Sequence, residues 1–324
     1  MALDLVPFAE GHLDEAAALV AVRIEAQRDA LPLLPDPLAS AHAVFPHLAH
    51  LVEHGSGVAL LEGSRLAGFL GALHVPLFGG TPGAYVPEWG HGAAAGTGRK
   101  AYRHLYRAAA AAWSDRGRST HAVTLLSLDR AAEHSLFEHG FGLVVIDAIR
   151  HLSGPGSAPA IEAGIRPAGA ADADSLGRLA EAVAAHLAAP PTFRVDEHDL
   201  LGTTEASRLA DETNIAFVAE SEGVILGWVG GTPGTGTYPL CTDDPSTVRL
   251  DRAFTLPEAR RSGIATSLVT TFLGEAARRG YHRCVVDYES ANPEAAGFWP
   301  SQGFVPFCRS LVRFVAPQLV TAPG

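Results

Sequence analysis

The residues from Arg249 to Val269 have the composition of a phosphate-binding turn between a strand and a helix. A β-strand is predicted to end at Leu256, because Pro257 lacks the N–H group that strand pairing needs. Gly263 and Ala265 then open a helix whose apolar residues recur at every fourth position. Small residues let a ligand approach the backbone, and the first N–H groups of a helix have no internal partner and carry the positive end of its dipole. Such a turn suits a pyrophosphate, although the same pattern by itself also occurs in ordinary strand-to-helix turns.

A second patterned segment lies beyond the next predicted strand. It reads Asn292-Pro-Glu-Ala-x-x-Phe-Trp-x-x-x-Gly-Phe304 and resembles a signature of the GNAT acyltransferase superfamily, Asn-x-x-Ala-x-x-Leu/Phe-Tyr-x-x-x-Gly-Phe. The first segment contains Arg260-x-x-Gly-x-Ala265, which resembles that superfamily's Arg/Gln-x-x-Gly-x-Gly/Ala signature. Because both occur in order with a predicted strand between them, the C-terminal half resembles an acyl-CoA-dependent N-acyltransferase domain.

The resemblance implies where acyl-CoA would bind. The strand end would pair with the pantetheine arm as an added strand does, and one of its N–H groups would polarise the thioester carbonyl. The turn would wrap the CoA pyrophosphate in backbone N–H groups, Asn292 would contact the CoA arm, and Phe298 would pack beneath it. The residues implied to bind the cofactor are Phe254, Thr255, Leu256, Arg260, Arg261, Ser262, Gly263, Ile264, Ala265, Thr266, Asn292 and Phe298.

Several residues of the second segment allow a different or a weaker role. Asn292 also fits a helix N-cap, since Asn followed by Pro is a good helix start, and the two roles are compatible. Phe304 is expected to pack in the core. Trp299 stands where many family members have a Tyr that protonates the leaving thiolate, and an indole N–H cannot act as a general acid. Tyr288 is close in sequence, but no geometric reason transfers the role to it.

Three carboxylates are candidates for the catalytic site. Asp251 is the first candidate for the general base, because family bases often come from this strand. Strand alternation would place Asp251 and Arg249 on the same face as Thr255. Asp287 and Glu289 end the neighbouring strand and could hold a cationic amine or relay its proton. The alternative is that they form a solvated acidic strand end or partner a helix cap.

The elements that would position these residues occur twice in the chain. Each half contains a strand–turn–strand hairpin with a glycine in its second strand, and later a Gly-Phe pair. Gly68 precedes Gly140 by 72 residues, and Gly227 precedes Gly303 by 76. This agreement predicts a tandem duplication.

The predicted fold class is α/β (mixed α+β), with two tandem GNAT-like domains. Each is a mixed, mostly antiparallel sheet flanked by helices, with a splayed central strand pair. The domains are predicted at residues 1–152 and 165–324, joined by a Gly/Pro-rich linker at residues 153–164. The helices expected near the site or its copy are about Asp14–Arg28, Arg99–Arg116, Asp172–Ala188, Gly263–Arg279 and Glu294–Trp299, and the strands are Thr247–Leu256 and Cys284–Tyr288.

The first half reads as a degenerate copy. Gly96 and Gly98 keep two glycines, but Ala93 stands where Arg or Gln would be expected, and the loop is expected to be longer. Asp129 and its neighbours occupy the region of the second signature without an Asn. We expect this domain not to catalyse, and instead to shape the acceptor pocket or support the catalytic domain.

Charge and composition exclude some function classes. The net charge is −11 and no basic run exceeds two arginines, so nucleic acid is a poor partner. The three cysteines stand far apart and the His residues show no shared period, so no disulfide framework and no metal site are expected. Neither a signal peptide nor a membrane span is predicted, which favours the cytoplasm.

The sequence therefore predicts transfer of an acetyl group from acetyl-CoA to the primary amine of a small molecule, by direct attack in a ternary complex. No cysteine lies in either signature, which argues against an acyl-enzyme. The alternatives are a non-catalytic acyl-CoA sensor or scaffold, and a protein or peptide N-acetyltransferase. The sequence names neither the acceptor nor the oligomeric state.

Overall fold

The computed structural model describes residues 3–77, 80–152, 161–194, 204–236 and 239–320. Most of the predicted linker, residues 153–160, lies outside the described residues. The chain forms two compact units. Unit 1 comprises Met1–Ile146, Tyr238–Thr242 and Pro306–Gly324, and unit 2 comprises Asp147–Thr237 and Asp243–Val305.

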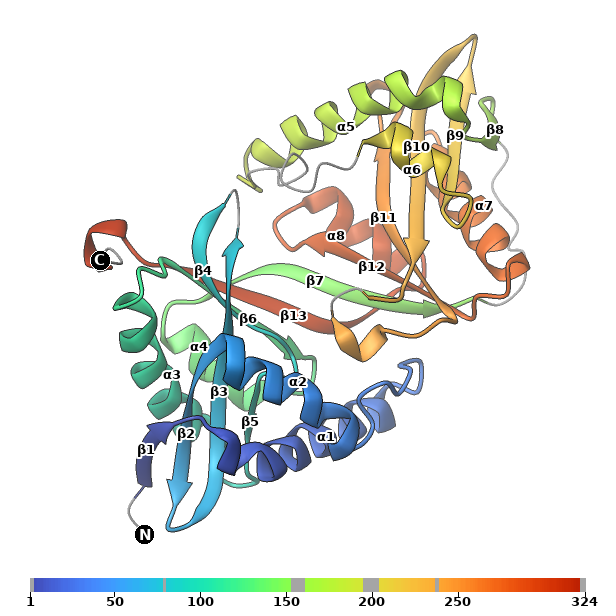
Figure 1. Ribbon diagram of the computed structural model, residues 1–324. Helices are drawn as coiled ribbons and strands as arrows, with labels where there is room; N and C mark the ends of the chain where they lie inside the picture. Colours follow the sequence, from blue (N-terminus) through green and yellow to red (C-terminus); the bar gives the residue numbers. More distant parts are fainter. Residues whose placement is uncertain (1–2, 78–79, 153–160, 195–203, 237–238, 321–324) are drawn as a thin grey trace. The chain divides into compact units, whose positions relative to one another are not determined.

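Unit 1 is a mixed sheet with helices on both faces (Figure 1). Its strand order is β1-β2-β3-β4-β6-β13, and β5 pairs with β3. Pairing is antiparallel except between β4 and β6. Helices α1 and α2 pack on each other, as do α3 and α4. The elements are β1 Leu3–Pro7, α1 Leu13–Ala30, α2 Ala41–His54, β2 Gly55–Glu62, β3 Arg65–Leu77, β4 Thr81–Val86, β5 His91–Ala93, α3 Gly98–Ser114, β6 Thr120–Leu126, α4 Arg130–Glu138 and β13 Val305–Phe314.

Unit 2 repeats this plan in the order β7-β12-β11-β10-β9-β8. Helix α5 packs on β10, and α7 packs on β9, β10 and β11. Only β11 and β12 pair in parallel among the strand pairs β8 to β12. The elements are β7 Gly142–His151, β8 Gly164–Pro167, α5 Ala173–Ala188, α6 Glu205–Ala210, β9 Ile215–Ser221, β10 Val224–Pro233, β11 Thr247–Thr255, α7 Ile264–Arg278, β12 Arg283–Glu289 and α8 Pro293–Ser301.

The last strand of each half belongs to the unit built on the other half. From Asp147 onward, β7 lies in unit 2, where it neighbours β12. From Pro306 onward, β13 lies in unit 1 and pairs antiparallel with β6, from Cys308 opposite Leu126 to Phe314 opposite Thr120. The sequence does not predict which unit receives β7 or β13, because the edge of either sheet would accept a strand with the same alternating pattern.

The local predictions for the second half agree with the structure to within a few residues. The predicted stripe of α7 is buried, with Ile264, Leu268, Phe272 and Ala276 each at most 4% exposed. The hairpin of β9 and β10 turns at Glu222 and Gly223, whose φ angles of 51° and 79° are those that a two-residue primed turn requires. Among the described residues, no helix is long and apolar enough to cross a membrane.

A β-bulge interrupts the pairing of β10 with β11. Gly230 lies opposite Arg252 and Gly231 opposite Leu250, so Asp251 is an extra residue on β11. Gly231 is required here, because a Cβ on it would lie 2.3 Å from the carbonyl oxygen of Arg249 and 2.6 Å from the ring of Phe272. The bulge therefore depends on a close approach that no side chain permits.

The bulge makes the predicted alternation along β11 wrong. Trp228 lies opposite Phe254 and both pack in the cluster beneath α5. Gly231, opposite Leu250, faces the α7 residue Phe272. Residues on the two sides of Asp251 have therefore changed face, so Arg249 and Thr255 do not share one.

In unit 1 the corresponding strand pair is bridged by buried polar side chains. Strands β4 and β6 stop pairing after Val86 and Val123. Beyond that point Arg23 of α1 donates to the carbonyl oxygens of Glu88 and His91, at 3.2 and 2.5 Å, and forms an ion pair with Asp129. The gap between the strands is thus spanned by side chains of the unit itself.

His91 extends this bridge. It contacts the hydroxyl of Tyr102 at 2.7 Å through Nδ1 and the carbonyl oxygen of Thr124 on β6 at 3.2 Å through Nε2. Burial, helped by the charge of Arg23, lowers the pKa of His91 to about 3, so the ring is neutral at neutral pH. Burial alone would raise the pKa of Asp129, but Arg23 outweighs it and holds that pKa below its ordinary value.

Glu88 is a fully buried carboxyl at the same place. Its Oε1 accepts a hydrogen bond from the backbone N–H of Cys241 at 3.0 Å, and its Oε2 has no hydrogen-bond partner among the described residues. Burial raises the pKa of Glu88 to about 7, with the Cys241 N–H and Arg23 opposing the rise.

Substituting Gly231 by Ala is expected to lower the free energy of unfolding by about 1–3 kcal/mol or more, since the new methyl group meets backbone that cannot yield. Gly230→Ala is the matched control on the same strand, because its Cβ would meet its nearest neighbour at an ordinary 3.4 Å. Urea denaturation of both variants measures the difference. Equal losses for the two would contradict the packing described.

Glu88→Gln is expected to change how stability depends on pH. The unfolded carboxyl has its ordinary pKa of 4.5, so between that pH and about 7 the folded protein keeps a proton that the unfolded chain releases. Stability should therefore fall as pH rises through this window. Relative to the wild type, the variant should gain about 3 kcal/mol between pH 5 and pH 8. Thermal and urea unfolding at both pH values test this, with the exposed Glu25→Gln as a control that should show no such gain.

Candidate active site

Unit 2 contains a cleft of about 750 Å³ where β11 and β12 separate. The two strands pair in parallel from Thr247 and Arg283 to Leu250 and Val286, and no pair is recorded beyond, although both strands continue. The cleft is lined by the separated strand ends, the start of α7, α8 and the last turns of α5. Backbone groups that face the gap lack a strand partner, and a buried backbone group needs one.

The turn between β11 and α7 presents its backbone to this cleft. Arg261 and Gly263 have φ angles of 63° and 86°, and Gly263 is the N-cap of α7 without a side-chain cap. The first N–H groups of α7 therefore point out of the helix without an internal partner. Arg260 closes the turn by donating from Nε to the carbonyl oxygen of Thr255 at 3.2 Å, and its guanidinium lies 5.6 Å from the ring centroid of Phe254.

Most of the residues implied to bind the cofactor line the cleft. Three do not: Ile264 is buried as the first residue of α7, Ser262 donates its hydroxyl to the carbonyl oxygen of Ala259, and Leu256 packs against the apolar cluster that includes Leu176 and Leu179 of α5. The residues that line it are Phe254, Thr255, Arg260, Arg261, Gly263, Ala265, Thr266, Asn292 and Phe298.

Asn292 has the predicted N-cap geometry. Its side-chain oxygen accepts from the N–H groups of Glu294 and Ala295 at 3.2 and 3.3 Å, and it lies at the cleft as well. The N-cap is thus confirmed, and contact with CoA stays a prediction. Phe304 is buried, as expected for a core residue, and packs edge-on against Trp299 at 5.4 Å between ring centroids.

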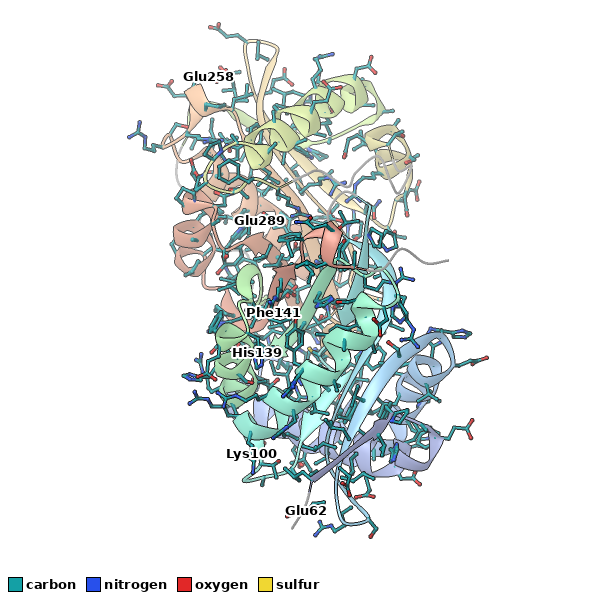
Figure 2. The ribbon with its side chains drawn as sticks, turned by 90° about the vertical axis from the view of Figure 1, so that its left-hand side faces the viewer. Glu62, Lys100, His139, Phe141, Glu258 and Glu289 are labelled. Carbon is teal, nitrogen blue, oxygen red and sulfur yellow. The ribbon has the colours of Figure 1, made fainter. Side chains whose placement is uncertain are left out.

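All three predicted acids line the cleft, and each forms an ion pair with an arginine. Asp251 accepts from Arg208 at 2.6 Å. Asp287 accepts from Arg249 at 2.5 Å. Glu289, at the end of β12 and labelled in Figure 2, forms an ion pair with Arg194. No motif predicted these arginine partners, since two of the pairs join residues more than 40 positions apart.

Sequence reasoning missed the contribution of α5 and the segment after it. Ala180, Val183 and His186 of α5, together with Arg194, line the cleft. The apolar periodicity of α5 predicted a helix but not the surface it covers. Tyr288 also lines the cleft, and burial leaves it only 5% exposed.

At the corresponding place in unit 1, side chains of Arg23 and His91 span the gap between β4 and β6. Eleven residues separate β4 from α3, against eight between β11 and α7, as expected for a longer loop. Three of the eleven form β5, which pairs with β3 as far as Ala93. The N-terminus of α3 is preceded by Thr97, whose hydroxyl donates to the carbonyl oxygens of Ala67 and Ala94.

Comparison with known proteins agrees with this geometry. Residues 182–304 match the family model described as the acetyltransferase (GNAT) family. N-acetyltransferase 8 of Homo sapiens is 33% identical over 102 residues, which cover 30% of this chain and 41% of that protein's length.

Two solved structures share the fold. A GCN5-related N-acetyltransferase from Sphaerobacter thermophilus superposes with a TM-score of 0.62 at 16% identity, covering 98% of this chain and 97% of that one. The glucosamine N-acetyltransferase region of a fungal multi-domain β-N-acetylglucosaminidase gives a TM-score of 0.57 at 12% identity, covering 96% of this chain and 38% of that one. Residues 182–304 therefore resemble an acetyltransferase (GNAT) domain, and the chain shares the fold of the two solved structures.

Proposed function

We propose that unit 2 transfers an acetyl group from acetyl-CoA to a primary amine by direct attack within a ternary complex. The observation that carries the proposal is the open N-terminus of α7 beside the unpaired ends of β11 and β12 in one cleft. The pyrophosphate would bind the N–H groups at the start of α7, and the pantetheine arm would pair with the end of β11.

In this reaction the amine nitrogen bonds to the thioester carbon, the carbon–sulfur bond breaks, and CoA leaves as the thiolate. The acceptor arrives as an ammonium ion, so a proton must be removed before attack. Glu289 is the carboxylate that we assign to this step. Its side chain is 9% exposed, while its partner Arg194 is 29% exposed and is the most accessible of the three arginines paired with the acids.

Asp251 and Asp287 have a different role in this proposal. Asp251 receives a second, longer hydrogen bond of 3.5 Å from Thr232, and Arg208 is only 14% exposed. Asp287 holds Arg249, whose pKa is raised above its ordinary value: burial opposes the rise, and Asp287, Asp147 and Asp251 outweigh it. These pairs keep the strand ends in place, which makes both acids positioning residues.

No cysteine is placed to carry the acyl group. Cys284 is fully buried on β12, and burial raises the pKa of its thiol to about 12, so it stays protonated and unreactive at neutral pH. Trp299 cannot protonate the leaving thiolate, and Tyr288 supplies a phenol to the cleft that can.

The proposal assigns one cofactor site to each chain, because Arg23 and His91 span the corresponding gap of unit 1. Calorimetric titration of acetyl-CoA should therefore give a stoichiometry of one. Gly263→Asp should weaken binding at least about tenfold, since it adds a carboxylate beside the pyrophosphate. Gly96→Asp, at a glycine with a similar φ angle of 83° before α3, is the matched control and should leave affinity unchanged. A stoichiometry of two would refute the division between the units, and no binding would refute the proposed function.

Glu289→Gln should lower kcat for amine acetylation at pH 7 by about 10² to 10⁴ with acetyl-CoA affinity unchanged. The loss should shrink at alkaline pH, because more of the acceptor amine is then deprotonated in solution. Release of the CoA thiol with a panel of amines measures kcat across pH. Glu181→Gln, an exposed residue of α5 outside the cleft, serves as control. A loss that does not change with pH would argue against proton removal by Glu289.

A further inference from the structure

Every carboxylate that lines the cleft is paired with an arginine. The charged residues of the lining are Arg194, Arg249, Asp251, Arg252, Arg260, Arg261, Asp287, Glu289 and Glu294. The four carboxylates pair with Arg208, Arg249, Arg194 and Arg260, and Arg252 pairs with Glu205 at 3.1 Å. Along the described part of the cleft wall, an ammonium ion therefore finds no carboxylate that is not already engaged by an arginine.

A cationic acceptor can reach a carboxylate here only by replacing a guanidinium. That replacement leaves the arginine without its counter-ion in a partly buried site, which is strongly unfavourable. The penalty is offset when the acceptor brings an anionic group of its own, since one ion pair of the protein is then replaced by two, and the arginine keeps a counter-ion. A wall of paired charges selects acceptors that carry both charges, and it disfavours polycationic amines.

The pair of Arg194 and Glu289 is the one suited to such an exchange. Arg249 lies in the field of Asp147 and Asp251 as well as Asp287, and it is 17% exposed. Arg208 pairs with Asp251 but is not part of the cleft lining. Arg194 follows α5 outside any helix or strand, held by a hydrogen bond from its N–H to the carbonyl oxygen of Leu187. Its greater exposure and its place outside any strand allow the guanidinium to turn without disturbing the sheet.

We propose that the acceptor is an amino carboxylate, whose ammonium group binds Glu289 while its carboxylate binds Arg194. This inference rests on the proposed function and names its acceptor class. A carboxylate is favoured over other anions in this pair, because the planar guanidinium donates two parallel hydrogen bonds to it. The acceptor nitrogen is then held on the carboxylate that removes its proton.

The test compares matched probes that differ only in the anionic group. Glycine, β-alanine, 4-aminobutyrate and L-lysine are titrated against their amides and against spermidine, by calorimetry, with the wild-type protein alone and saturated with CoA. At least one amino carboxylate should bind about tenfold or more tightly than its amide, and spermidine should bind weakly. The proposal is overturned if the amides or spermidine bind as tightly, or if no amino carboxylate binds.

Three variants test whether Arg194 recognises the carboxylate of the acceptor. Arg194→Gln should bring the affinities of acid and amide together, and Arg194→Lys, which keeps the charge without the two-pronged geometry, should give an intermediate ratio. Arg178→Gln, whose side chain lies on α5 outside the cleft and donates to Ser175, should keep the wild-type ratio. An unchanged ratio in Arg194→Gln overturns the assignment. Loss of acetyl-CoA binding would contradict the proposed function and not the acceptor class. The two are distinguishable because binding of the probes is also measured without CoA.

Discussion

The separation of β11 from β12 after Leu250 and Val286 is the constraint on which the rest of unit 2 depends. Two parallel strands that diverge leave N–H and C=O groups without partners, and such groups are costly when buried. The protein can satisfy them with a ligand or with its own side chains. The bulge at Asp251 and the close approach at Gly231 shape β11 beside a turn whose helix N-terminus is open, which is the arrangement that the proposed cofactor site needs.

Unit 1 shows the second outcome for the same strand arrangement. Arg23 and His91 bond to backbone carbonyl oxygens between β4 and β6 from within the unit, and Asp129 pairs with Arg23. The two units thus share a fold and differ in what fills the gap.

The electrostatic environment of the cleft depends on its ion pairs more than on the net charge of the chain. The chain carries a net charge of −11, yet each predicted catalytic acid is held by an arginine. An acid paired in this way is a poor base until its partner is displaced, because the ion pair favours the charged carboxylate. In the proposed reaction, recognition of the acceptor and activation of its nitrogen would then be one event at Glu289.

The sequence by itself determined what local backbone chemistry decides. The start of α7 at Gly263, the cap at Asn292, the hairpin turn at Gly223 and the repeated order of elements depend on residues within a few positions of one another. The family signatures placed the cleft on the right strands and helices, while the cofactor contacts and the roles of the acids remain predictions. Only the tertiary structure decided which arginine holds each acid, which surface α5 covers, how the bulge reverses the faces of β11, and which unit receives each final strand. These depend on packing between segments distant in sequence, and a chain pattern records which face of a strand is apolar without recording what will lie against it.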